Sequence, residues 1–220
     1  MLVACWSAKG GSGTTVVAVA LATVLSRSSV GGAVLADLAG DVPAVLGLPD
    51  PTGPGLLDWL AAGDDVPVDA LARIELPGPA GLRLLPRGGP APQTSGSGDR
   101  RGDVLAAVLA ADPRPVVVDC GCGPVGAGLA VAAAASSSLL VTRQCYLALR
   151  RAIAAPVRPS GIVVVAEAGR VLDQRDIEDA LGVPVRAVVS ADPAVARAVD
   201  AGLLSARLPR SLERAVRRAA

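Results

Sequence analysis

The chain has 220 residues, of which 51% are hydrophobic, and its formal net charge is only +1. Histidine and phenylalanine are absent and tyrosine occurs once, which excludes Ser/His/Asp and Cys/His catalysis and disfavours stacking platforms for single-stranded nucleic acid. Because no run of eighteen purely apolar residues occurs and no leader-like segment follows Met1, we expect a cytoplasmic protein.

Short apolar runs alternate with alanine-rich or amphipathic segments along the chain. In chain order we predict a strand at 2–6, a helix at 14–26, a strand at 32–37, helices at 55–62 and 68–73, a strand at 81–86, a helix at 101–111 and a strand at 115–119. Further strands are predicted at 137–142, 162–165 and 185–189, with helices at 147–155, 174–181 and 194–201. A segment near 87–102, rich in Gly, Pro and Ser, is predicted to be a flexible surface loop.

The predicted strands are nearly continuous apolar runs, which is typical of a parallel sheet covered on both faces. Their alternation with helices predicts a doubly wound α/β fold, with a mostly parallel sheet and helices on both faces. A chain of this length accommodates one large core, so residues 1–220 are expected to form a single nucleotide-binding domain. In such folds, ligands bind at the carboxyl ends of the strands.

The only lysine of the chain stands in a glycine-rich turn between the first predicted strand and the first predicted helix. The turn reads Ala8-Lys9-Gly10-Gly11-Ser12-Gly13-Thr14-Thr15. Glycines let the backbone approach an anion, and the N–H groups at the start of the following helix favour a phosphate. We therefore predict that residues 9–15 cradle phosphate groups, although a glycine-rich turn without a ligand is also common in α/β proteins.

This turn departs from the standard phosphate loop, G-x-x-x-x-G-K-[ST]. Ala8 replaces the first glycine and Thr14 replaces the lysine, whereas Gly13 and Thr15 remain in register. Losing a lysine removes a charge-assisted contact of about 1.5 to 3 kcal/mol, or one to two decades of affinity. Phosphate binding is thus predicted to be weakened but retained.

Three acidic residues lie where the architecture places its ligands. Asp119 ends the apolar run 115–118, Asp37 ends the second predicted strand, and Asp41 follows four residues later. A lone carboxylate after a strand often caps a helix. Beside a phosphate loop, however, we expect Thr15, Asp37 and Asp119 to hold Mg²⁺, the last of them through water.

These motifs resemble the ParA/MinD superfamily of P-loop ATPases with a deviant Walker motif. The run Lys9 to Gly13 matches the start of the family motif K-G-G-x-G-K-[ST], and Thr15 matches its magnesium hydroxyl. Residues 82–88, 116–121 and 192–202 look like the family's third strand, its Walker B strand and its late nucleotide-side turn and helix. The resemblance implies a P-loop NTPase fold, ATP and Mg²⁺ as cofactors, and a nucleotide-sandwich homodimer in which Lys9 reaches the partner's phosphates.

Within the superfamily, residues 37–48 look most like the CpaE/TadZ and septum-site-determining branch, which tolerates degraded phosphate loops. The family's catalytic carboxylate normally lies two residues after the first acid, where this chain has Ala39. The resemblance implies catalytic roles for Lys9, Asp37 and Asp41, of which Asp41 is displaced from the family spacing. Hydrolysis should therefore suffer more than binding.

Taken together, these features predict a dimerising ATP-binding switch, with slow or absent hydrolysis, that positions a septum, a pilus assembly site or a chromosome region through an unknown adaptor or cargo. A nucleotide-free scaffold for protein interaction is the main alternative. DNA partitioning is a third hypothesis, and it depends on Arg207, Arg210, Arg214, Arg217 and Arg218. A solvated last helix explains these arginines more simply, and the stripe of Leu212 and Val216 is too short for membrane insertion.

The four cysteines, Cys5, Cys120, Cys122 and Cys145, lack the paired C-x-x-C arms that tetrathiolate metal sites usually show. We therefore expect them to be buried small hydrophobic residues rather than metal ligands or redox groups.

Overall fold

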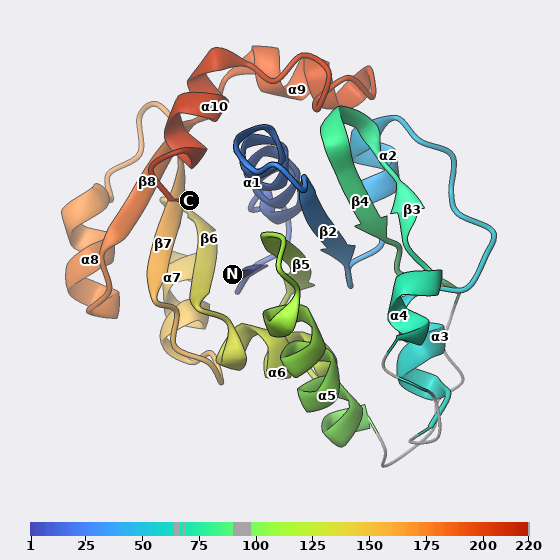
Figure 1. Ribbon diagram of the computed structural model, residues 1–220. Coiled ribbons are helices and arrows are strands. Elements are labelled where there is room, and N and C mark those ends of the chain that lie inside the picture. The colour runs from blue at the N-terminus through green and yellow to red at the C-terminus, as the bar shows by residue number, and fades with distance from the viewer. Residues whose placement is uncertain (64–66, 68, 90–97, 220) are drawn as a thin grey trace.

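The computed structural model describes residues 1–63, 67, 69–89 and 98–219, which form an eight-stranded sheet with helices packed on both faces (Figure 1). The strands are β1 (Leu2–Ser7), β2 (Ala33–Asp37), β3 (Leu76–Pro77), β4 (Leu82–Leu85), β5 (Val116–Cys122), β6 (Ser137–Arg143), β7 (Gly161–Ala166) and β8 (Val185–Ser190). The helices are α1 (Thr14–Ser28), α2 (Val42–Leu46), α3 (Leu56–Ala61), α4 (Ala70–Arg73), α5 (Gly98–Ala111), α6 (Ala127–Ala134), α7 (Tyr146–Ile153), α8 (Gln174–Leu181), α9 (Pro193–Asp200) and α10 (Arg210–Val216), with the short 3₁₀ helix η1 (Pro79–Gly81).

The strand order of the sheet is β3-β4-β2-β5-β1-β6-β7-β8. Every neighbouring pair runs parallel except β3 and β4, which are antiparallel. This order confirms the predicted doubly wound α/β fold with a mostly parallel sheet. Because β1, β5 and β2 are consecutive in the sheet, the loops that follow them meet at one edge.

The two faces of the sheet carry separate apolar layers. Helices α1, α2 and α10 contribute to one layer, and α3, α5 and α6 contribute to the other; Figure 1 shows α1 and α10 across the sheet from α5 and α6. The residues 17–26 of α1 are all buried, so its alanine and valine content reflects a helix surrounded by core rather than one with a solvent face. This packing fixes the start of α1 against the sheet.

The sequence prediction omitted α2, β3, η1 and α6. For α6 the signal was weak because the residue before it, Gly126, offers no side-chain cap and its alanine-rich sequence lacks a polar face. Val131 and Ala132 of this helix are buried under the sheet. Tertiary packing, rather than local helix signals, therefore defines α6.

The last helix is a second correction. Its arginines were expected to be solvated, and they are, but Leu212 and Val216 of α10 are 0% exposed and belong to the same apolar layer as α1. The five arginines at its ends and on its outer face are exposed: Arg207, Arg210, Arg214, Arg217 and Arg218. The apolar stripe that was judged too short for a membrane is thus part of the core.

The glycine-rich loop near 87–102 ends earlier than predicted, because α5 already begins at Gly98. Buried contacts hold the first turns of α5: the Arg101 guanidinium stacks 3.8 Å from the centre of the Trp59 ring and donates to the Trp59 carbonyl at 2.8 Å. A side chain at Gly102 would come within 2.9 Å of Ala127. Residues 90–97 of the predicted loop lie outside the described residues.

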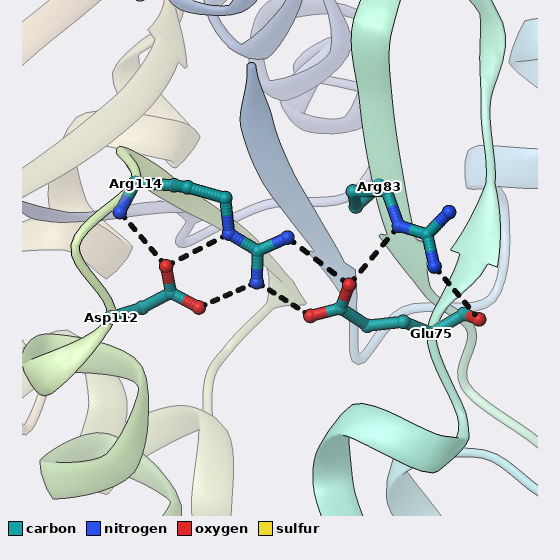
Figure 2. A network of polar contacts seen from close by, with 4 residues as sticks. All are labelled: Glu75, Arg83, Asp112 and Arg114. Carbon is teal, nitrogen blue, oxygen red and sulfur yellow. Dashed lines mark hydrogen bonds and ion pairs between the residues drawn. The ribbon is translucent and has the colours of Figure 1, made fainter. Parts of the chain in front are cut away.

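A polar network connects three distant segments at the edge of the sheet where β4 and β5 begin. Arg114 forms ion pairs of 2.6 Å with Glu75 and 2.7 Å with Asp112, and Glu75 also pairs with Arg83 of β4 at 3.1 Å. Figure 2 shows Glu75 between the two arginines. The hydrogen bonds from Arg114 and Arg83 outweigh the effect of burial and hold the pKa of Glu75 below its ordinary value.

In the described part of the chain, no helix combines the length and the apolar character needed to cross a membrane.

Candidate functional site

The loops that follow β1, β2 and β5 surround a cavity of about 900 Å³, here called the first cavity. Its described walls are residues 10–16 from the β1–α1 turn, Leu38, Ala39 and Asp41 from the β2–α2 loop, and residues 120–128 after β5. Helices α2 and α3 add Ala44, Val45, Leu57 and Leu60. The cavity therefore lies at the carboxyl ends of the strands, where ligands bind in this class of fold.

The glycine-rich turn is shaped for an anion. Gly13 precedes α1 with a φ of 90°, and Gly11 has a φ of 75°, a conformation that favours glycine. The Ser12 hydroxyl donates to the Lys9 carbonyl at 2.6 Å and closes the turn. No side chain caps the N-terminus of α1 and no acid stands in its first turn, so its N–H groups are available to a phosphate in the first cavity.

The predicted residues of this turn do not all face the first cavity. Thr15 lines the first cavity at the start of α1. Thr14 also lines it, at the position where the standard phosphate-loop motif has a lysine. Lys9 is half-buried and is not among the described residues that line the first cavity. The single lysine thus lies outside the described wall of the first cavity.

Asp119 is the carboxylate with an unused oxygen. Its side chain is 0% exposed, and Oδ1 accepts a 3.0 Å hydrogen bond from the Gly121 N–H. Oδ2 is buried without a hydrogen-bond partner among the described residues. Burial raises the pKa of Asp119 to about 6, against the opposing effects of the Thr15 hydroxyl and the Gly121 N–H.

Such an oxygen beside a hydroxyl suits a hydrated divalent cation, because a buried unpaired carboxylate oxygen otherwise loses its solvation without compensation. The donor set of Thr15 and Asp119 consists of oxygens only, which is what Mg²⁺ prefers. The residues present therefore fit the implied metal.

Asp37 of β2 and Asp119 of β5 lie opposite each other in the strand register. The carboxylate of Asp37, however, accepts more hydrogen bonds than that of Asp119. Oδ1 accepts hydrogen bonds from the N–H groups of Ala39 at 3.0 Å and Gly40 at 2.6 Å, and Oδ2 accepts one from Val42 at 3.1 Å. Burial raises the pKa of Asp37, while these three N–H groups lower it. The carboxylate holds the β2–α2 loop in place, and its role in holding Mg²⁺ stays a prediction.

The β2–α2 loop presents Asp41 and Ala39 to the first cavity. Asp41 is exposed and directly precedes α2. Ala39 lies beside Gly121, so that a side chain at Gly121 would come within 3.2 Å of the Ala39 methyl group. A methyl group therefore occupies the wall position two residues after Asp37, and Asp41 is the exposed acid of this loop.

The sequence reasoning missed the loop after β5 as a wall of the site. Its glycines adopt positive φ values, 70° at Gly121, 61° at Gly123 and 51° at Gly126, and their close spacing in the sequence was the available signal. The loop also carries Cys122, which is exposed and lines the first cavity.

This corrects the expectation that all four cysteines are buried: Cys5 and Cys120 are buried, whereas Cys145 is half-buried and Cys122 is not buried at all. The difference arises because Cys122 lies at the end of β5, beyond the last position covered by helices on both faces.

Comparisons with known proteins agree with this architecture. No protein-family model and no curated protein matches the sequence, but solved structures do. The ParA family ATPase from Chlorobium tepidum TLS is 20% identical with a TM-score of 0.75, over 98% of this chain and 96% of that chain. The septum site-determining protein MinD from Pyrococcus horikoshii OT3, complexed with Mg-ADP, is 19% identical with a TM-score of 0.77, over 99% and 93%.

A variant of Cyanothece McdA, solved as its ATP complex, is 18% identical with a TM-score of 0.70, over 98% of this chain and 93% of that chain. At such identities the likeness concerns the fold, and the chain has the ParA/MinD-like P-loop fold.

Proposed function

We propose that the chain is an ATP-binding, dimerising switch that positions cell machinery such as a septum, a pilus assembly site or a chromosome region, with weak or no hydrolysis. The observation that carries this proposal is the buried Oδ2 of Asp119, which has no partner among the described residues and whose carboxylate lies near the Thr15 hydroxyl. Thr15 itself stands at the uncapped N-terminus of α1 and lines the first cavity. Similar folds were solved with Mg-ADP and with ATP, which supports a nucleotide as the occupant.

We propose the following roles for the residues of the site. Residues 10–15 would surround the phosphates with backbone N–H groups and hydroxyls. Thr15 and Asp119 would hold Mg²⁺, Asp119 through water. Bound Mg²⁺ would supply positive charge to the phosphates. Asp37 orders the loop that presents Asp41, which is the acid available to orient a water molecule.

Weak hydrolysis is proposed because two positions of the same site lack the charged side chains that the family motif has there. Thr14 brings a hydroxyl where an ammonium would stabilise the phosphate charge, and Ala39 brings a methyl group where a carboxylate would orient the attacking water. The first loss weakens binding and the second affects only the transition state. We therefore propose a steady-state rate below about 0.01 per second, against about 1 to 1,000 per second for typical enzymes.

Dimerisation is proposed through Lys9. This lysine does not line the first cavity of its own subunit, as expected of a residue that acts on a partner's nucleotide. The partner is thus a second copy of the chain, joined by a protein adaptor or cargo. DNA contact through the exposed C-terminal arginines is a secondary proposal, and a net charge of +1 offers little long-range attraction for it.

The test is Lys9→Ala. Size-exclusion chromatography with light scattering should show a wild-type dimer with Mg·ATP and a monomer without it, and the mutant should remain monomeric in both. Arg175→Ala, which removes one exposed positive charge from α8, should dimerise like the wild type. A mutant that dimerises normally with Mg·ATP would refute the role of Lys9, and a wild type that retains no nucleotide would favour the scaffold alternative.

A second test separates binding from turnover. Thr14→Lys should tighten ATP binding by about ten-fold or more while changing the hydrolysis rate less, because it restores a contact to the ground state but not the acid at Ala39. Equilibrium dialysis with labelled ATP and a phosphate-release assay measure the two quantities. Brisk hydrolysis by the wild type would show that Asp41 or another group replaces the missing carboxylate.

A further inference from the structure

A second cavity, of about 570 Å³, lies behind the β2–α2 loop. Its described walls include Leu35 of β2, Leu84 of β4 and the proline-rich segment that follows α2, residues 48–54. Helix α2 separates it from the first cavity: Val42 and Pro43 face the second, whereas Ala44 and Val45 face the first. A volume of this size and an apolar lining are typical of small-molecule sites.

One charged group belongs to this apolar wall. Asp37 lines the second cavity and is 1% exposed. Leu35 and Asp37 are two residues apart on β2, so their side chains share a face of the sheet. In the part of the chain that the structure describes, Asp37 forms no ion pair with a lysine or arginine, and its partners are backbone N–H groups.

The hydrogen bonds of Asp37 leave room for one more donor. A carboxylate offers roughly four acceptor positions, and the N–H groups of Ala39 and Gly40 take two on Oδ1 while Val42 takes one on Oδ2. A buried carboxylate is stabilised when a cation or a further hydrogen-bond donor occupies its remaining acceptor position.

The mouth of the second cavity also carries negative charge, like Asp37 inside it. Asp50 is exposed there, and the one arginine in the described wall, Arg73, already pairs with Asp69 at 3.2 Å. The charges that a ligand meets on entry therefore favour a cation over an anion.

We propose that the second cavity binds a small apolar molecule that carries a single protonated amine. The apolar part lies against Leu35, Leu84 and the proline-rich segment, and the ammonium donates to Oδ2 of Asp37. This site lies across α2 from the first cavity and shares Asp37 with the nucleotide site proposed above. It does not require nucleotide to be bound.

Three matched probes test the proposal by calorimetric titration of the nucleotide-free full chain: 4-phenylbutylamine, 4-phenylbutan-1-ol and 4-phenylbutyrate. They share the apolar group and differ in the charge of the polar end. The amine should bind about ten-fold or more tightly than the alcohol and the carboxylate, because only the ammonium forms a charge-assisted hydrogen bond with Asp37. Equal affinity of amine and alcohol, or no heat from the amine at millimolar concentration, would overturn the proposal.

Three variants test where and how the amine binds. Thr52 is exposed at the wall of the second cavity, so Thr52→Trp should obstruct it and weaken amine binding about ten-fold or more without disturbing the core. Val171→Trp places the same side chain at a position that is 96% exposed and outside both described cavities, and its amine affinity should equal that of the wild type. Asp37→Asn should give amine and alcohol equal affinities. Unchanged amine binding in Thr52→Trp would show that the amine binds elsewhere.

Discussion

At the scale of single residues, two aspartates at the same register level of neighbouring strands meet different conditions. Asp37 has three backbone N–H donors, and Asp119 has one. Both are buried, and in the described part of the chain the Asp119 charge is stabilised, besides its one backbone N–H donor, only by the Thr15 hydroxyl. Asp119 is therefore the less stabilised charge, and its free oxygen is the group that a cation would stabilise.

Asp119→Asn should stabilise the ligand-free protein at about pH 8. The pKa of Asp119 is raised to about 6 in the folded protein from an ordinary value of 3.8, so its contribution to stability is present below that ordinary value and lost as the pH rises through about 6. Removing the charge should raise the free energy of unfolding by about 1 to 3 kcal/mol at pH 8 and by much less near pH 4. Urea denaturation at both pH values measures this.

The same variant should lose the stabilisation that Mg·ATP confers on the wild type, because it removes the anionic oxygen. Asp179→Asn, at an exposed position of α8, serves as the control and should change neither quantity. A variant that is less stable than the wild type at pH 8 would show that the carboxylate has a stabilising partner.

At the scale of elements, α2 is held from two sides. The N–H groups of the β2–α2 loop donate to Asp37 at its start, and at its end Gly47 packs against Gly202, which lies just after α9 and its C-terminal cap. Both glycines have positive φ, 70° and 64°. The wall between the two cavities is thus fixed by a backbone contact with a segment more than half the chain away.

Gly47→Ala should separate these segments. A Cβ at Gly47 would lie 2.3 Å from the Gly202 carbonyl oxygen, and alanine also disfavours the φ of 70°. We expect the free energy of unfolding to fall by about 2 to 4 kcal/mol. Thermal and urea denaturation measure the change.

Gly53→Ala is the matched control, because a Cβ there meets no atom within 4 Å and its φ is not positive. It should change stability by about 1 kcal/mol or less. Equal effects of the two substitutions would mean that the contact between Gly47 and Gly202 is not important for stability.

At the scale of the whole molecule, the network of Glu75, Arg83, Asp112 and Arg114 joins the region before β3, strand β4 and the α5–β5 connection. Hydrogen bonds from Arg114 also lower the pKa of Asp112. Acids with lowered pKa values stabilise the fold above their ordinary values, 4.5 for Glu75 and 3.8 for Asp112, and this contribution is lost as the pH falls through the lowered values.

Glu75→Gln should therefore reduce the free energy of unfolding by about 1 to 2 kcal/mol at neutral pH, with a smaller difference from the wild type near pH 3. Asp103→Asn, at an exposed position of α5, should match the wild type throughout. Denaturation curves between about pH 3 and 7 test the expectation. A difference that grows towards low pH would contradict the stabilising role of the charged Glu75.

The sequence alone was sufficient to predict the class of fold, and it placed the candidate site at the carboxyl ends of the strands. Continuous apolar runs such as 116–118 indicate buried parallel strands. This pattern is present in the sequence whichever segments the strand packs against. The glycine-rich turn and the acids at the ends of two strands are local patterns, and the parallel topology brings such ends together. These features could be predicted because the local sequence pattern and the overall fold favour the same structure.

Other features were decided only by tertiary structure. Helix α6 and the burial of Leu212 and Val216 in α10 depend on surfaces supplied by distant segments, and nothing local specifies them. The distinct engagement of Asp37 and Asp119 depends on how many backbone N–H groups the folded loops aim at each carboxylate. The second cavity likewise exists only between elements that are far apart in the chain. Apolar period and loop composition can be read along one chain, whereas burial and hydrogen-bond direction belong to pairs of segments and are defined only when those segments meet.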